Sequence, residues 1–141
     1  MLLSTQQILL EIIFWLYFSN SIILIIHKIE SAYLKKWDLF KIKGSIASIL
    51  AIHLLLLAIV LYGLVEVYAE TGIGLLFSIF LCFVGFFTFS IHIYFLRKGR
   101  EEFQSAISKF ILFSLLIISL VQFVITIIVL FTPILYHCAF C

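Results

Sequence analysis

The chain has 141 residues, room for one domain, and 65% of them are hydrophobic whereas 11% are charged. Soluble globular domains contain roughly 45–50% apolar and about 25% charged residues, so this composition excludes a soluble domain and a disordered segment and predicts a protein that lies mostly in the lipid bilayer. The three cysteines are too few for a disulfide scaffold, and the formal net charge of +2 is too small to indicate a nucleic-acid partner.

Four segments are long and apolar enough to cross a bilayer as helices. They are residues 8–26, 46–69, 73–96 and 110–136. A helix needs about 20 mostly apolar residues for the crossing, whereas barrel strands would alternate in polarity. Because the four segments are apolar on all sides, we predict one all-α integral membrane domain over residues 1–141, a bundle of four transmembrane helices in up-down-up-down order.

The connections between these segments differ in length and character. The first, 28–45, is rich in lysine and repeats apolar residues at helical spacing, which predicts that the first helix continues as an amphipathic segment at the headgroup level. Only Glu70, Thr71 and Gly72 separate the second and third segments. This short connection predicts a tight helical hairpin, with Gly72 at the C-terminus of the second helix.

The distribution of basic residues predicts the orientation of the chain. All nine lysines and arginines lie in the first and third connections: Lys28, Lys35, Lys36, Lys41, Lys43, Arg97, Lys98, Arg100 and Lys109. The positive-inside rule places these connections on the cytoplasmic face, or its organellar equivalent, and both termini on the outer side. The N-terminus has neither a basic leader nor a small-residue cleavage site, so we expect the first helix to remain as an anchor in a plasma, inner or organellar inner membrane.

Small and hydroxylated residues recur at helical spacing in three of the segments. In the third segment they form one stripe: Gly74, Ser78, Leu81, Gly85, Thr88 and His92. The fourth segment has a similar face: Ser108, Ser119, Gln122, Thr126 and Pro133. The second segment contains the small pair Ala47 and Ala51. Because such side chains allow membrane helices to approach closely, all three patterns predict packing inside the bundle, with His92 turned into the protein.

Three histidines are candidate cofactor ligands. His27, His53 and His92 all map to the half of the bilayer next to the basic connections. Two imidazoles at similar depth on different helices are the ligand set of a b-type haem, so His53 and His92, or His27 with either, form a candidate haem site. The alternative interpretation is that these histidines are hydrogen-bonded within the bundle.

The acidic residues divide into two groups by their position. Glu30, Asp38, Glu101 and Glu102 lie among the basic residues, and we expect them to be solvated ion-pair partners. Glu11 and Glu66 lie toward the outer side, where no basic residue accompanies them. A membrane carboxylate of this kind can load and release a proton or cation, so both are candidate ion-coupling sites; otherwise they are interfacial acids.

The chain ends with a C-x-x-C pair, Cys138 and Cys141, preceded by His137. A histidine next to such a pair favours thiol reactivity, which makes the two cysteines a candidate redox site. The alternative interpretation is two terminal cysteines with no role in catalysis.

We predict a small structural or accessory subunit of a larger membrane complex, without catalysis of its own. The chain has little mass outside the bilayer and lacks a phosphate-binding loop, H-E-x-x-H and G-x-S-x-G. Its expected partners are the lipid bilayer and other integral membrane subunits. Two alternatives remain open: a small proton-coupled carrier or channel acting as a homo-oligomer, and a haem-carrying membrane anchor that transfers electrons.

Overall fold

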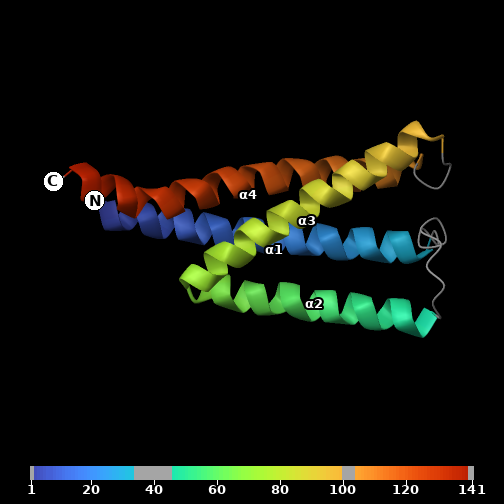
Figure 1. Ribbon diagram of the computed structural model, residues 1–141, viewed down its shortest axis with the longest axis horizontal. Coiled ribbons are helices and arrows are strands. Elements are labelled where there is room, and N and C mark those ends of the chain that lie inside the picture. Colours follow the sequence, from blue (N-terminus) through green and yellow to red (C-terminus); the bar gives the residue numbers. More distant parts are fainter. Residues whose placement is uncertain (1, 34–45, 100–103, 140–141) are drawn as a thin grey trace.

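The computed structural model describes residues 2–33, 46–99 and 104–139, with side chains for residues 5–33, 50–99 and 104–132. The chain forms four helices: α1 (Leu2–Tyr33), α2 (Ile46–Tyr68), α3 (Gly72–Arg97) and α4 (Ala106–Ala139) (Figure 1). All four are long and apolar enough to cross a membrane, which confirms the predicted all-helical fold. The sidedness of the termini and the up-down-up-down order across a membrane remain predictions.

The predicted helix boundaries are accurate for the two central helices, whereas α1 and α4 are longer than expected. The sequence has no glycine or proline before Gly44, so no residue type that stops a helix occurs within α1. Residues 28–33 of the predicted amphipathic segment therefore continue α1 as expected. The rest of that segment, 34–45, lies outside the described residues.

The turn between α2 and α3 differs from the prediction. Gly72 does not end α2 but begins α3, and the left-handed position is taken by Glu70, with a φ of 55°. The Thr71 N–H donates to the Glu66 carbonyl at 3.2 Å and the Glu70 N–H donates to the Val67 carbonyl at 3.1 Å. These two bonds form a Schellman motif with Glu70 at the position that glycine usually occupies, at a cost of about 1 kcal/mol.

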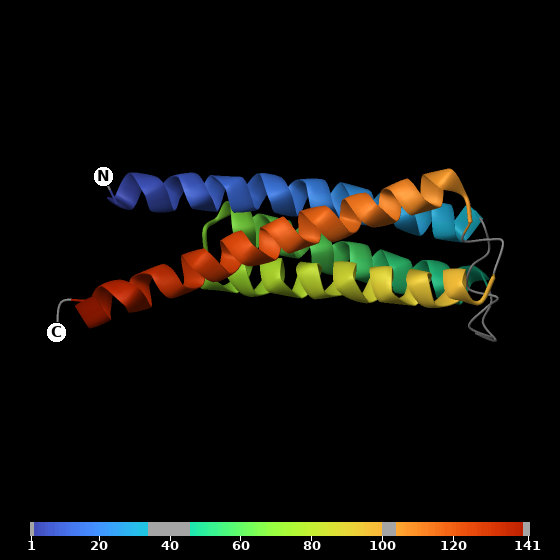
Figure 2. The ribbon, with the colours of Figure 1, turned by 90° about the horizontal axis from the view of Figure 1, so that it is seen from above.

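Three of the helices form the core, and α2 lies beside it. Helix α4 packs against α1 and α3, whereas α2 packs against α3 and α1 and makes at most a marginal contact with α4. Figure 1 shows α3 crossing the bundle from the hairpin with α2 toward the beginning of α4, and in Figure 2, seen from above, α4 runs obliquely to the other helices. Within its most apolar stretch α2 buries 17% of its residues, against 28–33% for the other three. Helix α2 is therefore the most exposed of the four.

The stripe predicted on α3 is confirmed, because all six of its residues are buried. On α4 the predicted polar residues Ser108, Ser119, Gln122 and Thr126 are buried as well, and the side chain of Pro133 lies outside the described part. Gly85 faces Ser119, and a Cβ at position 85 would collide with the serine side chain. The absence of a side chain at this glycine therefore allows α3 and α4 to approach closely.

The small pair predicted on α2 does not pack inside the bundle. Ala51 is exposed, and the side chain of Ala47 lies outside the described part. The prediction that Ala51 packs inside the bundle was wrong. Helical spacing shows which residues share a face of a helix, but it does not show whether another helix covers that face. Since α2 contacts only one side of the core, one of its faces remains open.

Candidate functional site

A network of five neutral polar side chains lies at the centre of the α1–α3–α4 core. This central polar network consists of Asn20 from α1, Ser78 from α3, and Ser119, Gln122 and Thr126 from α4, and all five are fully buried. The Asn20 amide nitrogen donates to Gln122 Oε1 at 2.8 Å and to Ser119 Oγ at 3.1 Å. Gln122 Nε2 donates to Ser78 Oγ at 2.9 Å, and the Ser78 and Thr126 hydroxyls are 2.8 Å apart.

The central polar network joins α1, α3 and α4 by hydrogen bonds between neutral side chains. Its members carry no charge, and each donates to or accepts from another member across a helix interface. Tyr17 makes a comparable link, because its buried hydroxyl donates to the Val60 carbonyl of α2 at 3.0 Å. The α3 and α4 members were expected to be buried, but Asn20 and Tyr17 were not singled out. The polar triplet 19–21 within an apolar segment was the available signal.

A second polar cluster lies at the basic end of the bundle, which we define as the end where α1 and α3 stop and α2 and α4 start. It contains His27 and Glu30 of α1, His92 of α3 and Ser108 of α4. The His27 and His92 rings are in edge-to-face contact, with centroids 4.8 Å apart. Glu30 accepts a hydrogen bond from the Ser108 hydroxyl, and its other oxygen lies 3.8 Å from His27 Nδ1.

The position of Glu30 corrects one expectation. We expected a solvated ion-pair partner, but only 13% of its side chain is exposed, and it faces the protein interior. The reason is that Ser108 and His27 provide polar partners from inside the bundle. Glu30 therefore connects α1 to α4 near the basic end, in the same way that Asn20 connects them at the centre.

The candidate haem ligands occupy two different places. His27 and His92 are both buried and touch each other, so no porphyrin plane separates their rings in this arrangement. His53 is only half-buried and lines a groove between α1, α2 and α3. Within the described ranges, no three His, Cys, Asp or Glu side chains gather in a group that could hold a metal ion. A bound haem remains a prediction.

The two candidate coupling acids have different surroundings. Glu11 is exposed on α1. Glu66 accepts hydrogen bonds from the Thr71 hydroxyl, at 2.7 Å, and from Tyr62. Thr71 also caps α3, because its Oγ1 accepts a hydrogen bond from the Gly74 N–H at 2.9 Å. Glu66 therefore helps to hold the α2–α3 hairpin, while ion coupling by either acid remains a prediction.

The candidate redox pair cannot be placed in the same detail. Cys138 belongs to the last turn of α4, but its side chain lies outside the described part, and Cys141 lies outside the described residues. The remaining cysteine, Cys82, is buried in α3. Redox activity of the terminal pair remains a prediction.

We expect Thr71→Ala to lower the free energy of unfolding by about 1 kcal/mol, the usual effect of losing an N-cap. The substitution removes the acceptor for the Gly74 N–H and the donor to Glu66. Unfolding in mixed micelles with an increasing fraction of dodecyl sulfate measures the change. Thr132→Ala is the matched control, because the Thr132 hydroxyl bonds only to the Ile128 carbonyl of its own helix. Equal losses in the two variants would contradict the capping role.

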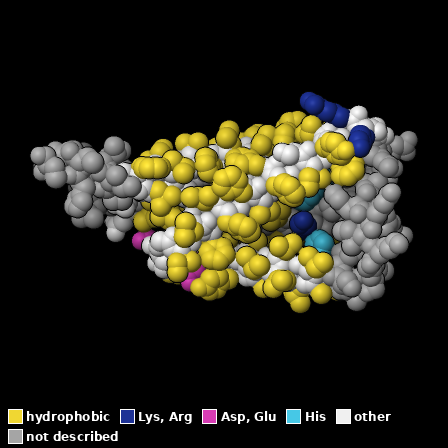
Figure 3. All heavy atoms as spheres, in the orientation of Figure 1, with side chains coloured by type: hydrophobic (Ala, Val, Ile, Leu, Met, Phe, Trp, Pro, Cys, Tyr) yellow, Lys and Arg dark blue, Asp and Glu magenta, His cyan; other side chains and the backbone are white. Residues whose placement is uncertain are grey.

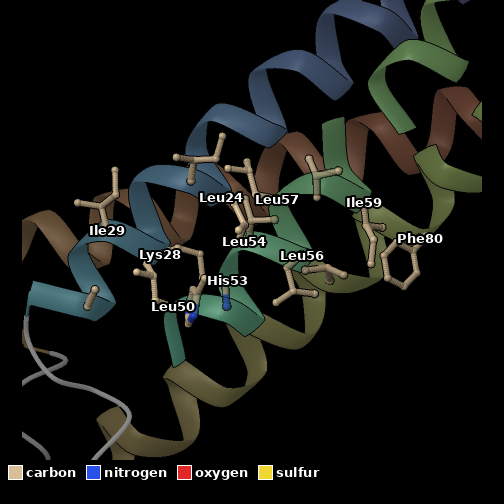
Figure 4. A pocket seen from close by; sticks show the side chains of 14 residues that line it. Leu24, Lys28, Ile29, Leu50, His53, Leu54, Leu56, Leu57, Ile59 and Phe80 are labelled. Carbon is tan, nitrogen blue, oxygen red and sulfur yellow. The ribbon is translucent and has the colours of Figure 1, made fainter. Parts of the chain in front are cut away.

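A groove with a volume of about 510 Å³ lies beside α2. Its walls come from α1, α2 and α3 and are apolar except at one end, where Lys28 and His53 lie. Figure 4 shows these two side chains, one from α1 and one from α2, at the same end of the groove. The arrangement suits an elongated apolar molecule with one polar end.

Fold and geometry together define an all-helical protein with four helices apolar enough to cross a membrane, joined internally by neutral hydrogen bonds. The chain belongs to DUF6713, a family of unknown function whose family model matches residues 13–129. The match extends from α1 into α4 and includes both polar clusters. No curated protein and no solved structure matches the chain.

Proposed function

We propose that the protein is a small, non-catalytic subunit of a larger membrane complex and that α2 is the helix that contacts its partner. The observation that carries this proposal is a small-residue face on α2 that the fold itself leaves uncovered. Ala51 and Ala58 are both exposed. They are seven positions apart, close to two helical turns, so they lie on the same face of α2.

The use of small residues elsewhere in the chain supports this proposal. On α3 and α4, small and hydroxylated residues are buried between helices. In a bilayer, lipid provides no hydrophobic drive for helix association, so close packing at small residues becomes a main source of affinity. Ala51 and Ala58 provide such a surface on α2, the least buried helix, with the exposed Leu55 between them.

The filled centre of the core supports a structural role over transport through a single copy. Asn20, Ser78 and Gln122 are fully buried and hydrogen-bonded to one another. A path between α1, α3 and α4 would have to break these bonds. A core filled in this way leaves little room for a lumen.

We expect Ala58→Trp to abolish co-purification of the partner when the tagged chain is extracted from its native membrane in a mild detergent. The bulky ring prevents close approach at α2 while leaving the core intact, since Ala58 is exposed. Ile117→Trp is the matched control, because Ile117 is 59% exposed on α4 and lies away from this face. Mass spectrometry of the purified particle identifies its components.

Two results would contradict the proposal. One is a stable native particle that contains only this polypeptide or its homo-oligomer. The other is equal retention of the partner by the wild type and Ala58→Trp, which would place the interface on another helix.

A further inference from the structure

The groove between α1, α2 and α3 has a long apolar body that is open at the surface. Leu24 of α1, Leu57 and Val60 of α2, and Phe80 and Val84 of α3 form its walls. Its volume of about 510 Å³ lies within the range of roughly 300–1,000 Å³ that is typical of ligand sites. Figure 3 shows that hydrophobic side chains cover most of this side of the molecule, while basic and histidine side chains gather toward one end.

The polar end of the groove carries positive charge. Lys28 is half-buried there, beside His53. Among the described residues, no carboxylate forms an ion pair with the Lys28 ammonium group. A cation within an apolar span is costly unless an anion or water accompanies it, so this position favours a negatively charged group.

The length of the groove matches one leaflet of a bilayer. The lining residues of α2 run from Leu50 to Val60, which corresponds to about 15 Å at the helical rise per residue. One leaflet contributes half of a hydrocarbon core of roughly 30 Å. A lipid with its headgroup at Lys28 could therefore lie in the groove with its acyl chain extending through the full thickness of the leaflet.

We propose that this groove binds an anionic phospholipid, with the phosphate at Lys28 and His53 and one acyl chain lying between α2 and the core. The lipid fills the groove between α1 and α2 near the basic end, and its phosphate lies beside the Lys28 ammonium group. Neither Ala51 nor Ala58 lines the groove, although Leu54 at its edge lies one helical turn from both. The lipid experiment contains no protein partner, so its result does not depend on the proposed partner surface. The two proposals can therefore fail independently.

The test uses the full chain in nanodiscs of phosphatidylcholine that contain a small fraction of phosphatidylglycerol. Native mass spectrometry then counts the lipids that stay bound after release from the disc. We expect the wild type to retain one phosphatidylglycerol in preference to phosphatidylcholine. The preference falls about tenfold in Lys28→Gln, the usual effect of losing a charge-assisted hydrogen bond, and returns in Lys28→Arg. Lys109→Gln is the control, because this exposed lysine lies outside the groove.

A second variant tests the apolar body of the groove. Leu54 lines the groove and is 67% exposed, so Leu54→Trp fills the space without disturbing the core. We expect this variant to lose the retained lipid of either kind while keeping wild-type stability. Because it keeps Lys28, it tests the site even if Lys28→Gln does not fold.

Several outcomes would overturn the proposal. They are equal retention of the two lipids by the wild type, an equal loss in Lys28→Gln and Lys109→Gln, and unchanged retention in Leu54→Trp. If inorganic phosphate displaced the lipid, the basic end of the groove would instead be a binding site for a soluble anion. A lipid-free dimer cross-linked through Leu54 would assign the groove to a second copy of the chain.

Discussion

Gly74→Ala is expected to lower the free energy of unfolding by about 3 kcal/mol, because the added methyl group has no space between α2 and α3. A Cβ at position 74 would lie 2.6 Å from the Glu66 carbonyl carbon and 2.7 Å from the Val67 nitrogen. Both atoms belong to the backbone of α2, which cannot rotate away as a side chain can. The hairpin between α2 and α3 must therefore open to accommodate one methyl group.

Gly72→Ala is the matched control for this prediction. Gly72 lies two residues earlier on the same helix, and an added Cβ there would meet no atom within 4 Å. We expect the free energy of unfolding of Gly72→Ala to stay within about 1 kcal/mol of the wild-type value, because alanine has a higher helix propensity than glycine and causes no clash here. Unfolding by dodecyl sulfate in mixed micelles measures both variants. Similar values for the two would show that α2 and α3 are not closely packed at Gly74.

The second large effect is expected for Gln122→Leu, which should lower the free energy of unfolding by about 2 kcal/mol. Gln122 accepts from Asn20 of α1 and donates to Ser78 of α3, and all three side chains are fully buried. Leucine fills similar space but leaves the polar groups of Asn20 and Ser78 without that partner. Interhelical hydrogen bonds in membranes average only about 0.6 kcal/mol, but here one side chain bonds to two other helices, so its loss leaves two buried polar groups without this partner.

A double-mutant cycle distinguishes the hydrogen bonds from simple packing. Asn20→Leu combined with Gln122→Leu removes both partners of the 2.8 Å bond, so the combined loss should be smaller than the sum of the single losses. Ser90→Ala is the control for removing a polar group that joins no helices, because Ser90 is exposed and bonds only within α3. Strict additivity of the two leucine substitutions would contradict coupling between Asn20 and Gln122.

Part of the candidate site could be predicted because it depends on helical periodicity alone. Residues three, four or seven positions apart share a face, so the buried face of α3 was determined by its small residues. Asn20 and Glu30 were not identified, because their burial depends on which face of α4 approaches α1. A single sequence without pairing information does not specify that contact.

The sequence by itself determined the four helices of this protein, the bounds of α2 and α3 and the polar faces of α3 and α4. The reason is that lipid provides no hydrogen bonds to the backbone, so long apolar segments have few alternatives to the helix. Only the tertiary structure decided that α2 lies beside a three-helix core, that Glu70 rather than Gly72 adopts the left-handed turn, and that Lys28 and His53 share a groove. These features depend on distances between helices that are remote in sequence, and helix propensity and hydropathy contain no information on those distances.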